Sequence, residues 1–265
     1  MHVVRRFWRG RAYNITMTCP RFFCSPDQLE LASGSFVDLP PGPARHAARV
    51  LRLAAGDGLT LFDGRGGEYP AVIDSVVKDR VGVRLGQRQD LERESPLDLT
   101  LIQALQGGDK MDFTLQKAVE LGVGTFVPVA SRRSVVRLDA DRAAKRLEHW
   151  QGVAVAACEQ CGRNRIPRVE AVQPLERALG QVAPGALRLA LLPGAAVSLA
   201  SLPLPAGPVV LLVGAEGGLA PEEAEAALAA GFRAVSLGPR VLRTETAGLA
   251  ALAAIQALWG DFREG

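Results

Sequence analysis

The hydrophobic and polar positions divide the chain into a first part of short strands and a second part in which strands alternate with helices. Between residues 20 and 90 the apolar stretches are short. Those at residues 59–62 and 68–73 flank a glycine-rich turn, which predicts a β-hairpin. A further alternating stretch covers residues 81–85. We therefore predict a small β-barrel over residues 20–90, followed by a polar linker that ends at Pro96.

The second part has the pattern of an α/β sheet. Strands are predicted at residues 97–104, 126–129, 187–192 and 209–213, and helices at residues 111–121, 140–161 and 244–258. Strands that alternate with helices build a parallel sheet with helices on its faces. Residues 97–262 are therefore predicted to form one α/β domain.

The last predicted helix, residues 244–258, is apolar on more than one face. Such a helix is buried on nearly all sides, and the sheet of one molecule covers only one of them. We therefore predict that its other side packs against a second copy of the chain in a homodimer. Small residues such as Ala251 and Ala254 allow close approach, and an arginine at either position is expected to disrupt association.

The positive charge of the chain is concentrated at its beginning. The chain has 31 Lys and Arg against 28 Asp and Glu, a net charge of +3. Residues 1–16 hold four arginines and no acid, so the chain from Met17 onward has 27 basic and 28 acidic residues. Residues 1–19 are expected to be a basic extension, either disordered or a mis-called start. Binding of a nucleic acid would therefore depend on local basic patches.

Composition also favours a cytoplasmic protein without a metal site. No apolar run approaches the ~18 residues of a membrane span, and the first residues lack the apolar core of a secretory signal. Four cysteines in 265 residues do not form a disulfide framework, which favours a reducing compartment. Cys158 and Cys161 have the spacing of zinc ligands, but on a helix they share a buried face, so no metal is expected.

Two glycine-containing loops carry the candidate chemistry. The first follows the apolar strand 209–213 and reads Gly-Ala-Glu-Gly-Gly at residues 214–218. The second covers residues 236–247 and carries Arg240, Arg243 and Glu245. Ligands of parallel sheets bind beyond the carboxyl ends of the strands, so the two loops are expected to share one crevice. Neither loop has the spacing of a dinucleotide fingerprint or a P-loop.

These motifs resemble those of the 16S rRNA (uridine-N3) methyltransferases of the RsmE type, in the SPOUT superfamily. The resemblance rests on residues 212–218 and 236–247, and on Gly-Asp-Lys-Met-Asp at 108–112, Gln-Lys-Ala-Val-Glu-Leu-Gly at 116–122 and Ala-Cys-Glu-Gln-Cys-Gly-Arg at 157–163. It covers residues 20–260. The chain departs from the family pattern at Ala215, where the family has proline, and at Val241, where it has isoleucine.

The resemblance implies a PUA-like RNA-binding barrel at residues 20–90 and a SPOUT domain with a deep trefoil knot at residues 97–262. It also implies that three loops wrap the cofactor S-adenosylmethionine. The cofactor-binding residues expected from it are Leu192, Gly194, Gly214, Glu216, Gly217, Gly218, Leu237, Gly238, Val241 and Leu242. The implied substrate is a uridine in the decoding region of the assembled small ribosomal subunit.

Methylation at N3 of uracil requires loss of a proton, so the site must hold a base or stabilise the imidate. The candidate bases are Glu216, Glu245 and Glu120. Arg243, Arg240 and Lys117 could hold negative charge on the uracil oxygens or bind a phosphate. Arg243 and Glu216 rank highest. Lys117 and Glu120 could instead form a surface pair, and Glu245 could instead cap its helix.

The candidate RNA-binding residues are Arg21, Arg49, Arg52, Lys110, Arg163, Asn164 and Arg240. Arg49 and Arg52 are expected on one side of a short helix at residues 46–53, where the alternative is that both are merely solvated. Two other functions stay open at this point. One is another SPOUT methyltransferase, acting on a ribose 2′-hydroxyl of tRNA, and the other is a non-catalytic RNA-binding protein.

Overall fold

The computed structural model describes residues 19–263, so the predicted basic extension lies outside the described residues apart from Cys19. The chain forms two compact units. The amino-terminal unit comprises the chain up to Asp63 together with Glu68–Gln89, and the carboxyl-terminal unit comprises Gly64–Gly67 together with Asp90–Gly265. Separate sets of buried apolar side chains form a core in each unit.

The amino-terminal unit contains a five-stranded mixed sheet with the order β1-β3-β4-β5-β2. Its strands are β1 (Arg21–Phe23), β2 (Phe36–Asp38), β3 (Gly58–Phe62), β4 (Tyr69–Val77) and β5 (Arg80–Leu85). β1 and β3 pair in parallel, and the other neighbours pair in antiparallel fashion. The pairing of β3 with β4 confirms the predicted hairpin. Side chains of Phe22, Leu61, Ile73 and Val83 are buried in the core.

The helical segment of this unit differs from the prediction. α1 (Pro41–Arg45) continues directly into a π-helical turn, η1 (His46–Val50), and the helix ends there rather than at residue 53. Arg52 lies beyond the helix with a φ of 56°, in the left-handed region. The argument that Arg49 and Arg52 share one side of a helix is therefore wrong, because a left-handed residue turns the chain away from the helical path.

The carboxyl-terminal unit is built on a parallel sheet. The strand order is β12-β10-β11-β6-β7-β8, with β9 also paired to β7. The strands are β6 (Leu99–Ala104), β7 (Thr125–Ala130), β8 (Arg168–Val169), β9 (Gln173–Pro174), β10 (Leu187–Leu191), β11 (Val209–Val213) and β12 (Arg233–Val235). All pairs are parallel, which confirms the predicted sheet. All five residues of β11 are buried, as expected for a central strand.

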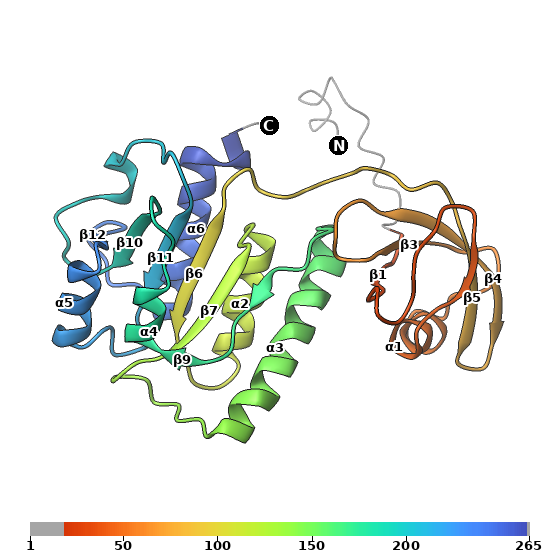
Figure 1. The fold of residues 1–265 in the computed structure, drawn as a ribbon, viewed down its shortest axis with the longest axis horizontal. Helices are drawn as coiled ribbons and strands as arrows, with labels where there is room; N and C mark the ends of the chain where they lie inside the picture. The colour runs from red at the N-terminus through yellow and green to blue at the C-terminus, as the bar shows by residue number, and fades with distance from the viewer. Residues whose placement is uncertain (1–18, 264–265) are drawn as a thin grey trace, which may run out of the picture. The chain divides into compact units, whose positions relative to one another are not determined.

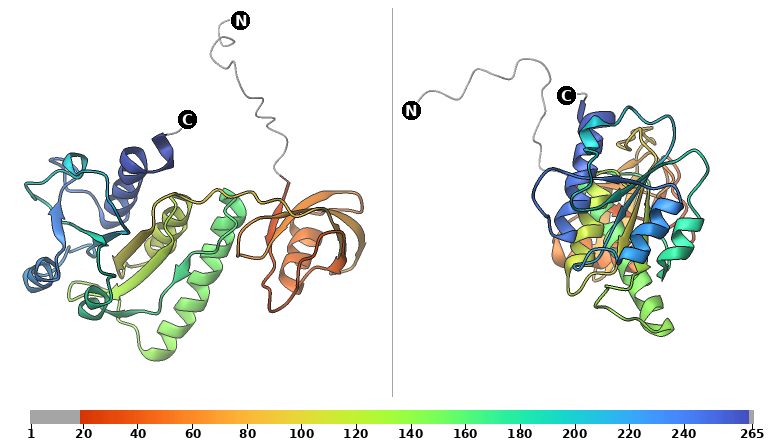
Figure 2. Two further views of the ribbon diagram at one scale, coloured as in Figure 1. Left: turned by 45° about the horizontal axis from the view of Figure 1, so that its top comes forward. Right: turned by 90° about the vertical axis from the view of Figure 1, so that its left-hand side faces the viewer.

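Helices cover both faces of this sheet. They are α2 (Lys110–Glu120), α3 (Ala140–Cys161), α4 (Leu175–Gly180), α5 (Pro221–Ala229) and α6 (Thr244–Trp259), with short 3₁₀ turns η2 (Leu199–Ser201) and η3 (Asp261–Arg263). α2 and α6 lie on one face, and α4 and α5 lie on the other (Figures 1 and 2). α3 packs against α2. Among residues 19–263, no helix has both the length and the apolar character of a membrane span.

The boundaries of α3 illustrate how local signals set the helices. Asp139 precedes the helix, and its side chain accepts a hydrogen bond of 2.8 Å from the N–H of Arg142. Gly162 ends the helix with a φ of 88°, a conformation that favours glycine. These two signals explain why the predicted range of 140–161 is the observed one.

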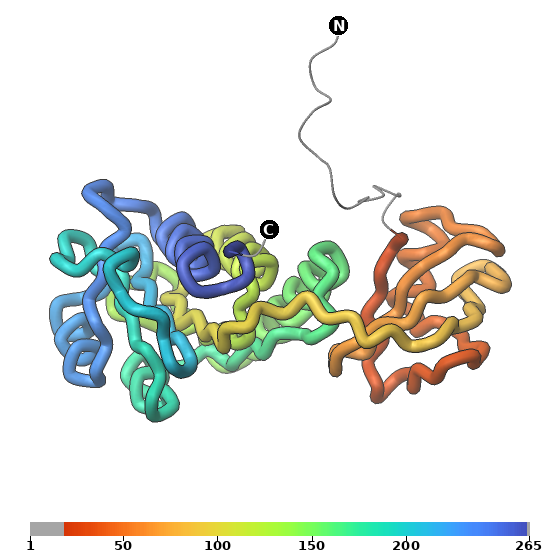
Figure 3. Tube along the Cα trace, turned by 90° about the horizontal axis from the view of Figure 1, so that it is seen from above, coloured from red at the N-terminus to blue at the C-terminus, as the bar shows by residue number. Residues whose placement is uncertain are grey.

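α6 lies beside α2, as the trace in Figure 3 shows. It follows β12, the strand at one edge of the sheet, and contacts β11 and η2. The carboxyl-terminal segment therefore returns from the edge to the middle of the sheet. The trefoil knot itself stays a prediction.

Candidate cofactor pocket and active site

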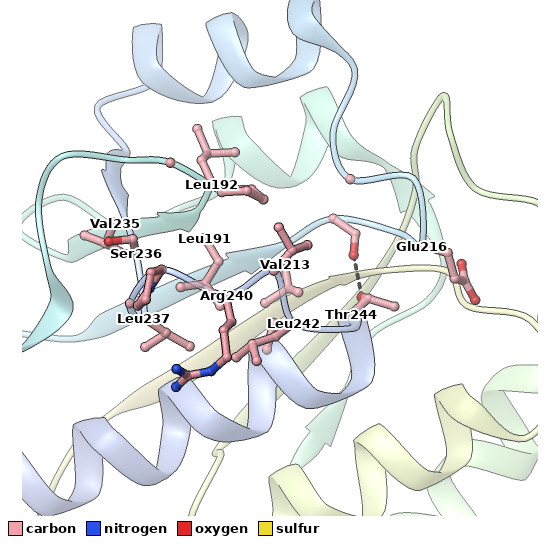
Figure 4. Close-up of a pocket in the computed structure, with 18 of the residues that line it drawn as sticks. Leu191, Leu192, Val213, Glu216, Val235, Ser236, Leu237, Arg240, Leu242 and Thr244 are labelled. Atoms are coloured by element: carbon pink, nitrogen blue, oxygen red, sulfur yellow. Dashed lines mark hydrogen bonds between the residues drawn. The ribbon is translucent and has the colours of Figure 1, made fainter.

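A pocket lies where the carboxyl ends of β10, β11 and β12 meet the start of α6. Parallel strands place the loops that follow them at one edge, which is where ligands of such sheets bind. Nine of the ten residues predicted to bind the cofactor line this pocket: Leu192, Gly194, Gly214, Glu216, Gly218, Leu237, Gly238, Val241 and Leu242. Glu216 lies at one end of the pocket, and Val235, Ser236 and Leu237 lie at the other (Figure 4).

The glycine-rich loop after β11 is a tight turn. The N–H of Gly218 donates to the carbonyl oxygen of Ala215 at 2.8 Å, and Gly218 has a φ of 71°. A Cβ at Gly214 would lie 2.7 Å from the carbonyl carbon of Gly218, which no side chain tolerates. Glycine is therefore required at both positions by the turn itself.

Gly217 is the predicted cofactor residue that does not line the pocket. A Cβ at Gly217 would lie 3.4 Å from the Cβ of Arg133. The Nη1 of Arg133 also donates to the carbonyl oxygen of Gly217 at 2.8 Å. Gly217 therefore faces the loop that follows β7, and its role in cofactor binding stays a prediction.

Buried polar side chains hold the glycine-rich loop against α6. The Oγ1 of Thr244 donates to the carbonyl oxygen of Gly214 at 2.6 Å (Figure 4). The Nε2 of Gln103, at the end of β6, donates to the same Oγ1 at 3.0 Å and to the carbonyl oxygen of Ala104 at 3.1 Å. All of these groups are buried, so each hydrogen bond replaces one that water would otherwise make.

Gln106 extends this network to α2. The side-chain amide of Gln106 is oriented so that its oxygen faces donors and its nitrogen faces acceptors. In this orientation the oxygen accepts a hydrogen bond of 3.2 Å from the N–H of Glu245. Its nitrogen donates to the carbonyl oxygen of Lys110 at 3.1 Å and to Oγ1 of Thr114 at 2.9 Å. The first turn of α6 is thereby connected to the first turn of α2. Sequence reasoning missed Gln103 and Gln106, although a glutamine inside the apolar run of a buried strand was a usable signal.

The starts of α2 and α6, together with the glycine-rich loop, bring three charged side chains together. The Nζ of Lys110 lies 3.7 Å from Oε1 of Glu216 and 3.5 Å from Oε1 of Glu245. The N–H of Gly107 donates to Oε1 of Glu216 at 3.1 Å. Among the atoms that the structure describes, Oε2 of Glu245 is buried and has no hydrogen-bond partner. Two candidate bases therefore lie around one ammonium group, and Glu216 is the member of this group that lines the pocket.

Lys117 and Glu120 form the predicted alternative, a surface pair. The Nζ of Lys117 lies 2.8 Å from Oε1 of Glu120, one turn further along α2. Neither residue lines the pocket, and their ion pair is separate from the charged group of Lys110, Glu216 and Glu245, so their catalytic assignment stays a prediction without support from these contacts. Arg243, which ranked highest with Glu216, is exposed before α6 and is not among the pocket-lining residues either. Arg240 does line the pocket.

Two predicted RNA contacts are structural residues instead. The side chain of Arg163 is 6% exposed, and it donates to Glu94 at 2.6 Å and to the carbonyl oxygens of Val119 and Val123. Asn164 is fully buried, and its Nδ2 donates to the carbonyl oxygen of Leu91. Both predictions are wrong, because these side chains hold the linker and the end of α2 rather than facing solvent.

Arginines of the amino-terminal unit have acidic partners. Arg21 lies 2.7 Å from Glu68 and over the ring of Phe62, and its side chain is 12% exposed. Arg49 makes two hydrogen bonds to Asp79, of 2.5 and 2.7 Å. The hydrogen bond and the charge of Asp79 raise the pKa of Arg49. The structure therefore does not support Arg21 as an RNA contact, and Arg49 is exposed but paired.

The cysteines lie apart from this chemistry. Cys158 is fully buried in α3, and burial raises the pKa of the Cys161 thiol. A raised pKa disfavours the thiolate, which is the metal-binding form. Among residues 19–263, no group of three or more His, Cys, Asp or Glu side chains is arranged to hold a metal ion.

Known proteins match both units. A family model described as an RNA methyltransferase domain matches residues 93–256, and one described as an RNA methyltransferase PUA domain matches residues 44–85. The ribosomal RNA small subunit methyltransferase E of Bacillus subtilis is 33% identical over 243 residues, which is 89% of this chain and 95% of the relative. That of Mycobacterium tuberculosis is 35% identical over 218 residues, covering 80% of this chain and 83% of the relative.

Solved structures give the same result. The crystal structure of a ribosomal RNA small subunit methyltransferase E from Neisseria gonorrhoeae, bound to S-adenosyl methionine, superposes with a TM-score of 0.86 at 44% identity. It covers 92% of this chain and 99% of the gonococcal chain. A putative methyltransferase from Legionella pneumophila, in complex with the same cofactor, also has a TM-score of 0.86, at 38% identity and with the same two coverages.

Proposed function

This chain belongs to the RNA methyltransferase family that includes ribosomal RNA small subunit methyltransferase E, and from that premise we propose that it methylates N3 of a uridine in 16S rRNA with S-adenosylmethionine. One observation carries the proposal. The relatives solved with this cofactor align with 92% of the chain, and the RNA methyltransferase family model that matches residues 93–256 spans the glycine-containing loops that form the pocket. The substrate uridine would lie in the decoding region of the assembled small subunit, in the cytoplasm.

The residues of the pocket fit this cofactor. The backbone of Gly194, Gly218 and Gly238 has positive φ, and a Cβ at each would meet no atom within 4 Å, which leaves room for a ligand against the main chain. Leu237 and Leu242 offer apolar surface for an adenine ring, and the exposed main chain offers hydrogen bonds to its edge. When bound, S-adenosylmethionine supplies a methyl group on a positively charged sulfur.

The charged side chains at the end of the pocket would handle the proton of N3. A carboxylate takes this proton as the new N–CH₃ bond forms, and the sulfur keeps the electrons of the broken S–CH₃ bond. Glu216 is the preferred base because it lines the pocket, and Glu245 is the second candidate. Lys110 would stabilise the negative charge that develops on a uracil oxygen, which replaces its predicted role as an RNA contact. Arg240 would bind the RNA from the pocket wall.

The protein is further proposed to act as a homodimer through α6. One stripe of this helix is apolar and not buried, with Leu249, Ala250 and Ala253 partly exposed and Ala257 exposed. Ala254 borders that stripe and is partly exposed, whereas Ala251 is fully buried within its own unit. The prediction that Ala251 faces the partner is therefore wrong. Arginine at position 251 would disrupt the core instead.

Deletion of the gene, followed by nucleoside analysis, tests the proposed function. Digested 16S rRNA from the deletion strain should lack one N3-methyluridine that the parent strain contains. The wild-type gene should restore it, and Glu216→Gln should restore it poorly, because glutamine cannot accept the proton. A deletion strain with unchanged N3-methyluridine, or with a lost 2′-O-methyl group in tRNA, would reject the proposal in favour of another activity.

A further inference from the structure

The segment between β7 and the middle of α3 carries an excess of positive charge. Residues 131–149 contain six Lys and Arg and three Asp and Glu. The six basic residues are all exposed: Arg132, Arg133, Arg137, Arg142, Lys145 and Arg146. We call residues 132–146 the basic loop; this range comprises the loop after β7 and the start of α3. Among the described residues, Arg137, Lys145 and Arg146 have no acidic group within 4 Å, so their charge is not neutralised by the protein.

The amino-terminal unit offers a contrast. Its described part has eight basic and eight acidic residues, so it carries no net charge. Besides the two pairs already described, Arg80 lies 3.1 Å from Asp38 and Arg84 lies 3.3 Å from Asp74. A phosphate group that binds such an arginine must compete with its carboxylate. Arg45, Arg52 and Lys78 are exposed and, among the described residues, have no acidic group within 4 Å, so this unit also offers some unneutralised charge. Residues 131–149 differ in having a local excess of three positive charges.

The basic loop lies at the edge of the sheet that carries the pocket. β7 is parallel to β6, and β6 is parallel to β11, so the chain leaves β7 at the same edge as the glycine-rich loop (Figure 1). Two hydrogen bonds hold the two loops together. Arg133 donates to the carbonyl oxygen of Gly217 at 2.8 Å, and the N–H of Arg132 donates to the buried Glu223 at 2.7 Å.

The glycine-rich loop thus separates two surfaces. On one side lies the pocket, and on the other lies Arg133. Glu216, at the end of the pocket, comes from the loop after β11, and Lys110, 3.7 Å from it, begins the helix α2 that follows β6. The basic loop follows β7, which is the next strand beside β6 in the sheet. A nucleotide that places its base near Glu216 would therefore place the neighbouring phosphates within reach of the basic loop.

From these observations we propose that the basic loop binds the phosphate backbone of the RNA that carries the target uridine. This inference rests on the proposed function, and it identifies a surface on the catalytic unit itself. Unpaired arginines and lysines on an anchored loop attract phosphates without reading the sequence. The inference rests on two observations. The order of the strands brings the basic loop to the end of the sheet that carries the pocket, and residues 131–149 have six basic against three acidic residues.

The test compares two double variants. Arg137→Ala with Arg146→Ala removes charge from the basic loop and leaves Arg133, which contacts Gly217, in place. Arg233→Ala with Arg263→Ala is the matched control. Both control arginines are exposed and, among the described residues, have no acidic partner within 4 Å. Arg233 begins β12, and Arg263 follows α6 and lies beside Pro96, which precedes β6. Both therefore lie at the amino ends of the strands, whereas the basic loop follows the carboxyl end of β7.

The substrate is the small ribosomal subunit from the deletion strain, and methyl transfer is measured between about 50 and 300 mM salt. Each lost phosphate contact reduces the salt slope of log(kcat/KM) by about 0.7 to 0.9, so the basic-loop variant should lose about 1.5. Its KM at 150 mM salt should rise about tenfold or more. Its kcat and its calorimetric affinity for S-adenosylmethionine should stay within twofold of wild type.

An unchanged KM and salt slope in the basic-loop variant, equal to those of the control, would overturn the inference. A wild-type protein that transfers no methyl group to subunits would count against the proposed function instead. Cosedimentation with the same subunits would then still compare the two variants. If the basic-loop variant and the control variant lost binding equally, the basic loop would be rejected as the phosphate-binding surface, because the loss would be a general effect of charge.

Discussion

Replacement of Thr244 by valine is expected to destabilise the carboxyl-terminal unit and loosen the cofactor pocket. Thr244 is the first residue of α6 and is 7% exposed. Its hydroxyl donates to the carbonyl oxygen of Gly214 and accepts from Gln103. Valine has nearly the same shape, so the substitution removes the hydroxyl without leaving a large cavity.

The structure indicates the magnitude. Without the hydroxyl, the carbonyl oxygen of Gly214 keeps only the more distant Nε2 of Gln103, at 3.4 Å. Gln103 itself keeps its hydrogen bond to Ala104. A buried polar group that loses its partner costs ~1–3 kcal/mol, so we expect about 2 kcal/mol less stability. For a unit of this size, that corresponds to a Tm lower by roughly 4–8 °C.

Scanning calorimetry with and without S-adenosylmethionine measures both effects. Thr246→Val is the matched control, because Thr246 is exposed in the same turn of α6. Thr244→Ser keeps the hydroxyl and should retain most of the stability. The cofactor should raise the Tm of Thr244→Val less than that of wild type, since Gly214 lines the pocket. If Thr244→Val melts within 1 °C of Thr246→Val, the buried network does not support the loop as argued here.

Three further comparisons of variants distinguish the surfaces of the protein. Gly217→Val should weaken cofactor binding less than Gly218→Val does. The reason is that Gly217 faces Arg133, whereas Gly218 lines the pocket and has a φ of 71°. Equal losses of calorimetric affinity in the two variants would contradict this prediction. Arg49→Ala with Arg52→Ala should reduce the salt slope of RNA binding by less than the basic-loop variant does, because Asp79 already neutralises Arg49. A larger reduction would locate the main phosphate contacts on the amino-terminal unit. Ala254→Arg should yield a folded monomer in sedimentation experiments with little methyl transfer, whereas Ala251→Arg should fail to fold; a fully active Ala254→Arg monomer would reject the dimer.

The parts of the fold that depend on local patterns were predictable. Apolar residues 209–213 indicate a buried strand whatever surrounds them, and Asp139 and Gly162 mark the ends of α3 by capping it. The short strands β8, β9 and β12 were not predicted. Two or three residues carry too little periodic signal, and only the neighbouring strand defines them.

The direction of a charged side chain was the least predictable feature. Arg163 is buried because Glu94 and two carbonyl oxygens, all distant in the chain, receive its hydrogen bonds. Lys110 lies near both Glu216 and Glu245 because the starts of α2 and α6 meet beside the glycine-rich loop, and the spacing of these residues in the sequence does not predict that meeting. The glycine-containing loops that line the pocket could be located from the sequence because a tight turn and a close ligand approach favour the same residue type.

Methyl transfer with purified components tests the central claim most directly. Small ribosomal subunits from the deletion strain would be incubated with the protein and isotopically labelled S-adenosylmethionine, and the 16S rRNA would be mapped by mass spectrometry. We predict one labelled methyl group, on N3 of one uridine, and a large loss of label with Glu216→Gln. A label on a ribose, or no label from a protein that binds the cofactor, would contradict the account.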